Sequence, residues 1–176
     1  MKTLFLAISL GLVATLQAQD PSAEDGEIED MSGRWYMKAM TADKQMPGRK
    51  VQFVTPMTIT ALEGGNLEIE VTMVANGQCE EMQVDLKKAD KPGKYTAFWG
   101  MRRVSIIKSS VKDHYVLYCE GKLFGIQVRM AKLVGRDPEN NQEALEDFKE
   151  IAAARGISSG RVTVLKQTET CPPGNK

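Results

Sequence analysis

Short segments in which apolar and polar residues alternate recur through most of the chain, and they constrain its fold more than any other feature. Alternate side chains of a strand point to the same face, so each segment is typical of a β-strand with one buried face. Eight such strands are expected, over residues 35–40, 57–61, 67–73, 82–87, 95–99, 103–108, 114–119 and 128–134. Turn signals separate them, among them Asn76-Gly77 and Lys91-Pro92-Gly93.

Many short strands in close succession predict an all-β barrel or sandwich. The short connections favour an up-and-down antiparallel barrel over a Greek key. Closing eight strands into a barrel removes the exposed sheet edges and leaves an interior that can hold one small ligand.

One helix is expected after the last of these strands. Asp137 fits the N-cap position and Pro138 the first helical position. Apolar residues then recur every three or four positions, at Leu145, Phe148, Ile151 and Ala152. Gly156 is the expected stop. A single apolar stripe predicts that the helix lies outside the barrel, and residues 162–165 fit a short ninth strand.

The first eighteen residues have the pattern of a secretory signal peptide. A basic start is followed by an apolar run from Leu4 to Leu16 and a small residue, Ala18, at the expected cleavage position. Residues 19–176 then form one domain. The alternative is an N-terminal anchor helix, although the run is shorter than a membrane span.

Equal numbers of basic and acidic residues, 23 each, argue against a nucleic-acid partner.

Secretion into an oxidising compartment favours one disulfide and one free thiol among Cys79, Cys119 and Cys171. Spacing alone allows three pairings. Cys171 lies in a polar, proline-rich tail that needs a tether, whereas Cys119 ends an apolar strand and is expected to be buried. We therefore predict a Cys79–Cys171 disulfide and a free Cys119, with a redox role for Cys119 as the alternative. The spacing of cysteine and histidine predicts no metal site and no cofactor.

Three short segments resemble the sequence motifs of the lipocalin family: Gly33-Arg34-Trp35-Tyr36, Asp113-His114-Tyr115 and Gly135-Arg136-Asp137-Pro138. His114 departs from the family's usual Thr-Asp-Tyr. The likeness covers the whole mature chain and is strongest to the subgroup of tear and salivary (von Ebner's gland) lipocalins. It implies an eight-stranded antiparallel barrel with one C-terminal helix outside, the same disulfide, and Arg136 packed over Trp35. We assign Gly33, Trp35 and Arg136 a structural role.

The inward faces of the expected strands are apolar and rich in methionine, which adapts to ligands of many shapes. They hold Met37, Met57, Ile59, Leu67, Ile69, Val71, Met73, Met82, Val84, Leu86, Leu117, Met130 and Val134. We take these, apart from Leu67 and Met82, as candidate ligand-binding residues; the alternative is that they simply fill the barrel. By resemblance, Gln45, Met46 and Val51 lie at the cavity rim.

Lys132 is the polar residue in the inward register of the last strand. A buried ammonium is costly without a partner, and a fatty-acid carboxylate would supply one. The alternative is a lysine that reaches solvent or pairs with a nearby carboxylate. The resemblance favours the ligand, because the subgroup's cavity lysine matches this position.

These features predict a secreted carrier or scavenger of small hydrophobic molecules such as fatty acids, other lipids, odorants or taste compounds. An enzyme is not expected, since the single histidine, His114, is expected to face outward and no Gly-x-Ser-x-Gly motif is present. The resemblance adds the alternative of a cysteine-protease inhibitor. It also implies further partners: a cell-surface receptor, a second copy in a weak homodimer, and IgE if the protein is an allergen. No membrane-embedded segment is expected.

Overall fold

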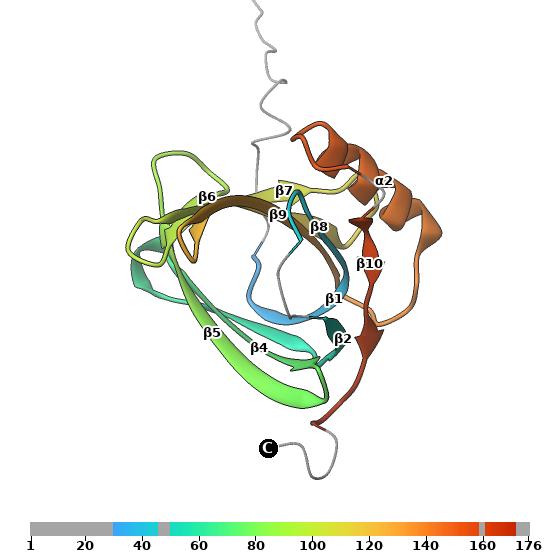
Figure 1. Cartoon of the computed structure of the whole chain (residues 1–176). Helices are drawn as coiled ribbons and strands as arrows, with labels where there is room; N and C mark the ends of the chain where they lie inside the picture. The colour runs from blue at the N-terminus through green and yellow to red at the C-terminus, as the bar shows by residue number, and fades with distance from the viewer. Residues whose placement is uncertain (1–29, 46–49, 159–160, 172–176) are drawn as a thin grey trace, which may run out of the picture.

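The structure is a computed structural model that describes residues 30–45, 50–158 and 161–171, and its strands wrap into one closed barrel (Figure 1). The expected signal peptide, residues 1–18, and the rim residue Met46 lie outside the described residues. The barrel strands are β1 Gly33–Ala42, β2 Val51–Val54, β3 Met57–Ala61, β4 Leu67–Ala75, β5 Gln78–Lys88, β6 Lys94–Ala97, β7 Arg102–Lys108, β8 His114–Leu123 and β9 Ile126–Gly135.

Consecutive strands from β3 to β9 pair antiparallel, and β1 closes the ring by pairing with both β9 and β3. The predicted up-and-down barrel is therefore confirmed. The sequence did not predict β2, which pairs with β4 as β3 does. Pro56 separates β2 from β3 because proline has no N–H to donate to the strand ladder. The two strands are therefore halves of one bent strand, and the barrel is eight-stranded.

A β-bulge in β1 shifts the faces of this strand. Met37 lies opposite Val134 and Ala39 lies opposite Leu133, so one residue of β1 has no counterpart on β9. After the bulge Met40 faces the cavity, whereas Ala39 packs outside the barrel. Strict alternation from Trp35 and Met37 would place Ala39 inward, and the bulge is the reason that it does not hold.

Helix α2, Gln142–Ala153, packs on the outside of the barrel against β8 and β9 (Figure 1). Its apolar stripe buries Ala144, Phe148 and Ala152 against outward-facing residues of the strands, which are Ala39, Val116, Tyr118, Ala131 and Leu133. The position of its N-cap was predicted wrongly: Asn141, and not Asp137, accepts the Ala144 N–H at 2.9 Å. Asp137 caps an earlier turn instead, by accepting the N–H of Glu139.

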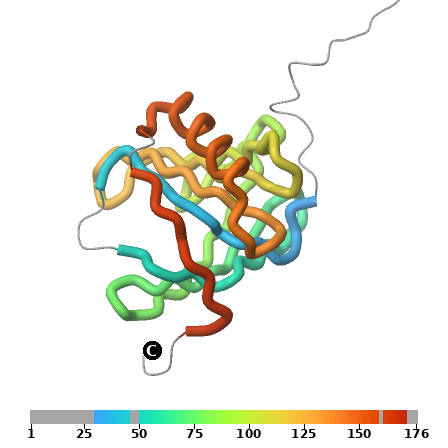
Figure 2. Tube along the Cα trace, turned by 90° about the vertical axis from the view of Figure 1, so that its right-hand side faces the viewer, coloured from blue at the N-terminus to red at the C-terminus, as the bar shows by residue number. Residues whose placement is uncertain are grey.

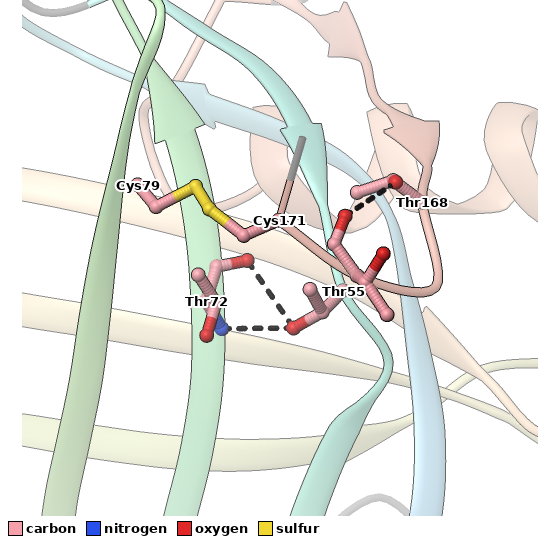
Figure 3. The surroundings of a disulfide bond; sticks show 6 residues. Thr55, Thr72, Cys79, Thr168 and Cys171 are labelled. Carbon is pink, nitrogen blue, oxygen red and sulfur yellow. Dashed lines mark hydrogen bonds between the residues drawn. A yellow bond between two sulfur atoms is a disulfide. The ribbon is translucent and has the colours of Figure 1, made fainter. Parts of the chain in front are cut away.

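The chain after α2 runs along the outside of the barrel (Figure 2). Strand β10, Thr163–Val164, pairs with β1 and confirms the expected ninth strand. Strand β11, Lys166–Gln167, was not predicted and runs parallel to β2. The predicted Cys79–Cys171 disulfide then ties the chain end to β5, beside the paired Thr55 and Thr72 (Figure 3). A crosslink over so long a loop stabilises the fold by roughly 4 kcal/mol in the chain-entropy model.

The end of the barrel that contains Trp35 is closed. The Trp35 ring is 2% exposed, its Nε1 donates to the Met31 carbonyl at 2.8 Å, and the Tyr115 ring meets it edge-on. The Arg136 guanidinium lies 3.8 Å from the centroid of the Trp35 ring. Gly33 leaves room for it, because a Cβ there would lie 3.1 Å from Arg136 Nη1. The structure thus places these three motif residues together as a floor.

His114 faces outward from the barrel as expected, but it is buried and hydrogen-bonded on the outer side of this closed end rather than solvated. Its Nδ1 lies 2.9 Å from the Lys112 carbonyl, which can only accept, so Nδ1 carries the proton and Nε2 is an acceptor. Nε2 accepts from Lys38 Nζ at 2.9 Å, and the same ammonium donates to Asp137 Oδ1 at 3.1 Å. We call Lys38, His114 and Asp137 the Lys38 cluster. The β1 bulge places Lys38 there.

Candidate ligand-binding site

The barrel encloses an apolar cavity of about 230 Å³. Eleven of the candidate residues line it: Met37, Val51, Met57, Ile69, Val71, Met73, Val84, Leu86, Leu117, Met130 and Lys132. They come from strands that are far apart in the sequence but adjacent around the barrel. The hydrophobic side chains therefore surround a void and do not fill the interior of the barrel.

Ile59 and Val134, two further candidates, do not line the cavity. Ile59 lies opposite Gly33 and Val134 lies opposite Tyr115, which places both at the level of the closed end. There they are fully buried in the same apolar cluster as Trp35. They form part of the packed floor, because the aromatic rings at this level fill the barrel.

The structure adds lining residues that the sequence analysis did not select: Met40, Met82, Ala97, Phe98, Arg102, Val104, Cys119, Leu123 and Phe124. Met40 was missed because of the β1 bulge. Phe98 and Phe124 lie in turns, where strand alternation gives no guidance. Cys119 was expected to be buried; it is a half-buried free thiol in the cavity wall. Strand periodicity over β6 and β7 could have found Ala97 and Val104.

The opposite end of the barrel carries an exposed aromatic rim. Arg102 pairs with Gly121, so the β6–β7 turn, residues 98–101, and the β8–β9 turn, residues 124–125, lie at the same end. Trp99 is 96% exposed and Phe124 is 82% exposed. Since Phe98 and Phe124 also line the cavity, the cavity reaches the surface here.

A second depression adjoins the cavity and shares Met40, Val51 and Met130 with it. Gln45, expected at the rim by resemblance, lies in this depression. Lys44, Lys50 and Arg161 also line it, which gives the approach to the cavity a basic character.

Two cations, Lys132 and Arg102, line the cavity, and none of the described lining residues is acidic. Lys132 is half-buried and lies opposite Leu117 of β8. Within the described part of the chain, its ammonium group has no hydrogen bond or ion pair with another residue. The site is thus a hydrophobic void with positive charge and, among the described residues, no counterion in its lining.

A family model described as the Lipocalin / cytosolic fatty-acid binding protein family matches residues 32–169. The chain belongs to this family. The lipocalin is 55% identical over 174 residues to Lipocalin-1 of Sus scrofa, which covers 99% of this chain and 98% of that protein. It is 54% identical to the major allergen Can f 1 of Canis lupus familiaris over the full length of both. It is 49% identical to von Ebner gland protein 1 of Rattus norvegicus, with 99% of each covered.

A solved structure of the siderocalin Ex-FABP superimposes on this lipocalin with a TM-score of 0.68 at 21% identity, over 80% of this chain and 96% of that one. At this identity the likeness shows the fold alone. No helix among the described residues is long and apolar enough to cross a membrane. In the same ranges, no group of three or more histidine, cysteine or acidic residues is placed to hold a metal ion.

Proposed function

We propose that this lipocalin is a secreted carrier or scavenger of small hydrophobic molecules, and that single acyl chains are its main ligands. The observation that carries the proposal is the apolar cavity of about 230 Å³ inside the barrel. Each methylene group buried there contributes about 0.8 kcal/mol. The volume lies just under the range of about 300–1,000 Å³ that is usual for ligand pockets, which favours a slender chain over a polycyclic sterol.

We propose Lys132 as the residue that binds the carboxylate of a fatty acid. Lys132 lines the apolar cavity and its ammonium group has no partner among the described residues, so an entering carboxylate gains a charge-assisted hydrogen bond without displacing an existing one. The methionines of the wall, Met37, Met57, Met73 and Met130 among them, can adjust to chains of different length and branching.

Displacement of a fluorescent fatty acid tests the proposal directly. Dodecanoic acid and dodecanol should both displace the probe, and the acid should bind more tightly. Lys132→Met should weaken the acid about tenfold, because it removes a charge-assisted hydrogen bond, and should leave the alcohol unchanged. Lys122→Met, which removes an exposed lysine from β8, is the matched control and should change neither. Failure of both ligands to bind the wild-type protein would contradict the carrier function.

The same proposal includes secretion without catalytic activity. The leader-like residues 1–18 support secretion, and the mass of the protein purified from its source should correspond to a chain that begins at residue 19. Native mass spectrometry of this material, followed by organic extraction, would identify the bound molecule. No feature of the described residues favours a cysteine-protease inhibitor, and a papain inhibition assay should be negative.

The receptor, the weak homodimer and the recognition by IgE remain predictions. Can f 1 is named as a major allergen, and its 54% identity over the whole chain supports a test of IgE binding with sera from sensitised patients. Sedimentation at increasing concentration tests the homodimer, and binding to secretory epithelial cells tests the receptor.

A further inference from the structure

The Arg102 side chain is buried inside the cavity near its open end. It is 5% exposed and lines the cavity together with Val104, the next inward residue of β7. The neighbouring Arg103 faces the other way: it is exposed and pairs with Glu120 at 3.1 Å. Two adjacent arginines thus have opposite environments, one in solvent with a carboxylate partner and one in an apolar cavity.

The hydrogen bonds of the Arg102 guanidinium are incomplete. Nη1 donates to the carbonyl oxygens of Gly121 and Lys122 at 3.3 and 3.5 Å, which are long for N–H···O bonds. Nη2 is buried and has no hydrogen-bond partner among the residues that the structure describes. An arginine stays charged at any physiological pH, and a buried charge is costly unless it is paired. Burial without a counterion points to a ligand as the missing partner.

Arg102 and Lys132 lie at different depths in the cavity. On β8, Arg102 lies opposite Gly121 and Lys132 lies opposite Leu117. Four residues of a strand separate these levels by about 13 Å, with Lys132 nearer the closed end. The wall between the two levels is apolar and includes Val104, Cys119 and Met130, so a ligand that spans them needs an apolar middle.

We propose that Arg102 is a second anion-binding residue and that the cavity accepts long-chain dicarboxylic acids, which carry an acidic group at each end. This inference rests on the carrier function proposed above. One carboxylate pairs with Lys132, the hydrocarbon chain lies along the apolar wall, and the other carboxylate pairs with the Arg102 guanidinium near the open end. A monocarboxylic acid leaves one of the two cations without a counterion, whereas a diacid satisfies both.

The wild-type protein itself provides the first test, in which dodecanedioic acid, dodecanoic acid and dodecanol compete for the same fluorescent probe. We expect the diacid to bind at least as tightly as the monoacid. With a single cation in the cavity, the second carboxylate would be buried without a partner and the diacid would bind more than tenfold more weakly. That result would overturn the proposal, and it requires no variant that might fail to fold.

Variants of the two adjacent arginines provide the second test. Arg102→Met should weaken the diacid at least tenfold more than it weakens dodecanol, since the alcohol has no carboxylate to lose its partner. Arg103→Met is the matched control and should change neither ligand, and Arg102→Lys should keep part of the affinity for the diacid. An unchanged affinity of Arg102→Met for the diacid would refute the role of Arg102.

Dodecanol separates this inference from the proposed function. If neither dodecanol nor dodecanoic acid binds the wild-type protein, the carrier function is wrong and the diacid has no site. If the alcohol binds but the diacid is rejected, the carrier function stands and only the role of Arg102 is lost.

Discussion

The outer side of the closed end and the interior of the cavity each bury a cationic side chain, but the two cations differ in the hydrogen-bond partners that the protein supplies. Lys38 is 6% exposed and Arg102 is 5% exposed, so both have lost nearly all contact with water. Lys38 has a ring nitrogen of His114 and a carboxylate oxygen of Asp137 within hydrogen-bonding distance. Arg102 has two carbonyl groups at 3.3 and 3.5 Å and one nitrogen that finds no partner among the described residues.

This difference separates a structural charge from a binding charge. A buried cation whose partners are all supplied by the protein holds strands together, and replacing a partner leaves a charge that the fold cannot solvate. A buried cation with a free donor makes the empty protein less stable and becomes favourable when an anion enters. The same degree of burial therefore predicts opposite effects of mutation in the two regions.

The largest effect is expected from His114→Ala in the Lys38 cluster. The substitution leaves a void and removes one of the two acceptors of the buried Lys38 ammonium, and it should lower the free energy of unfolding by about 3 kcal/mol. Urea denaturation followed by tryptophan fluorescence measures this loss. Lys122→Ala, an exposed change on the same strand, is the control. A loss below about 1 kcal/mol would show that the cluster is not a structural tie.

Gly135→Ala should destabilise the protein by about 2 kcal/mol through crowding of the same cluster. A Cβ at this position would lie 2.8 Å from His114 Nε2 and Cδ2 and 3.0 Å from Lys38 Cε. The imidazole ring is held at both nitrogens and cannot move aside easily. Thermal unfolding measures the effect, and combining the substitution with His114→Ala should recover part of the stability. Strict additivity of the two changes would contradict direct crowding.

Arg102→Met should act in the opposite direction and stabilise the empty protein by about 1 kcal/mol. Replacing a buried, incompletely paired charge by an apolar side chain of similar length is often neutral or favourable. Thermal unfolding of delipidated protein gives this value, with Arg103→Met as the control. A clear loss of stability would indicate that the bonds from Nη1 to the β8–β9 hairpin are structural, and the contrast with Lys38 would disappear.

The smallest effect concerns acid stability. Burial raises the pKa of Asp137, but the hydrogen bond and charge of Lys38, with smaller effects from the Glu139 N–H and His114, together outweigh burial, so the pKa lies below its usual value. A carboxyl group whose pKa is lower in the folded than in the unfolded protein stabilises the fold at any pH above its unfolded pKa of about 3.9. This stabilisation is lost as the pH falls through the lower pKa of the folded protein. Asp137→Asn should therefore lower the free energy of unfolding at neutral pH. The loss should stay below about 1 kcal/mol because the carboxylate is half exposed, and it should be smaller at acidic pH. Denaturation curves at several pH values test this; an equal loss at every pH would refute it.

The sequence predicted the barrel because the patterns that indicate its strands and turns lie within short segments of the chain. Alternation within each strand and short turns between strands are enough to give the order β3 to β9, and the helical spacing of Phe148 and Ala152 is enough to place α2 outside. Some local errors were small: the N-cap of α2 lies at Asn141 because the turn at Asp137 comes first. Strand β2 was missed because four residues before Pro56 carry too short a pattern.

Alternation fails where one residue changes the face of a strand. The bulge in β1 moves Ala39 outward and Met40 into the cavity, and nothing in the sequence of β1 marks it. The pair Arg102 and Arg103 shows a related limit: alternation with Val104 favours Arg102 for the inward face, but the sequence gives no sign that a charged side chain is buried there. That burial comes from the register of β7 against β8.

By itself, the sequence determined the strands other than β2 and β11, the closed meander, the external helix, the Cys79–Cys171 pairing and the apolar character of the interior. Only the tertiary structure decided that the centre is hollow, that Ile59 and Val134 belong to the floor, and that His114 is buried. It also decided which cations have partners. The physical reason is that void volume and counterions depend on residues brought together across the barrel by long-range strand pairing, whereas alternation reports only the face of each strand.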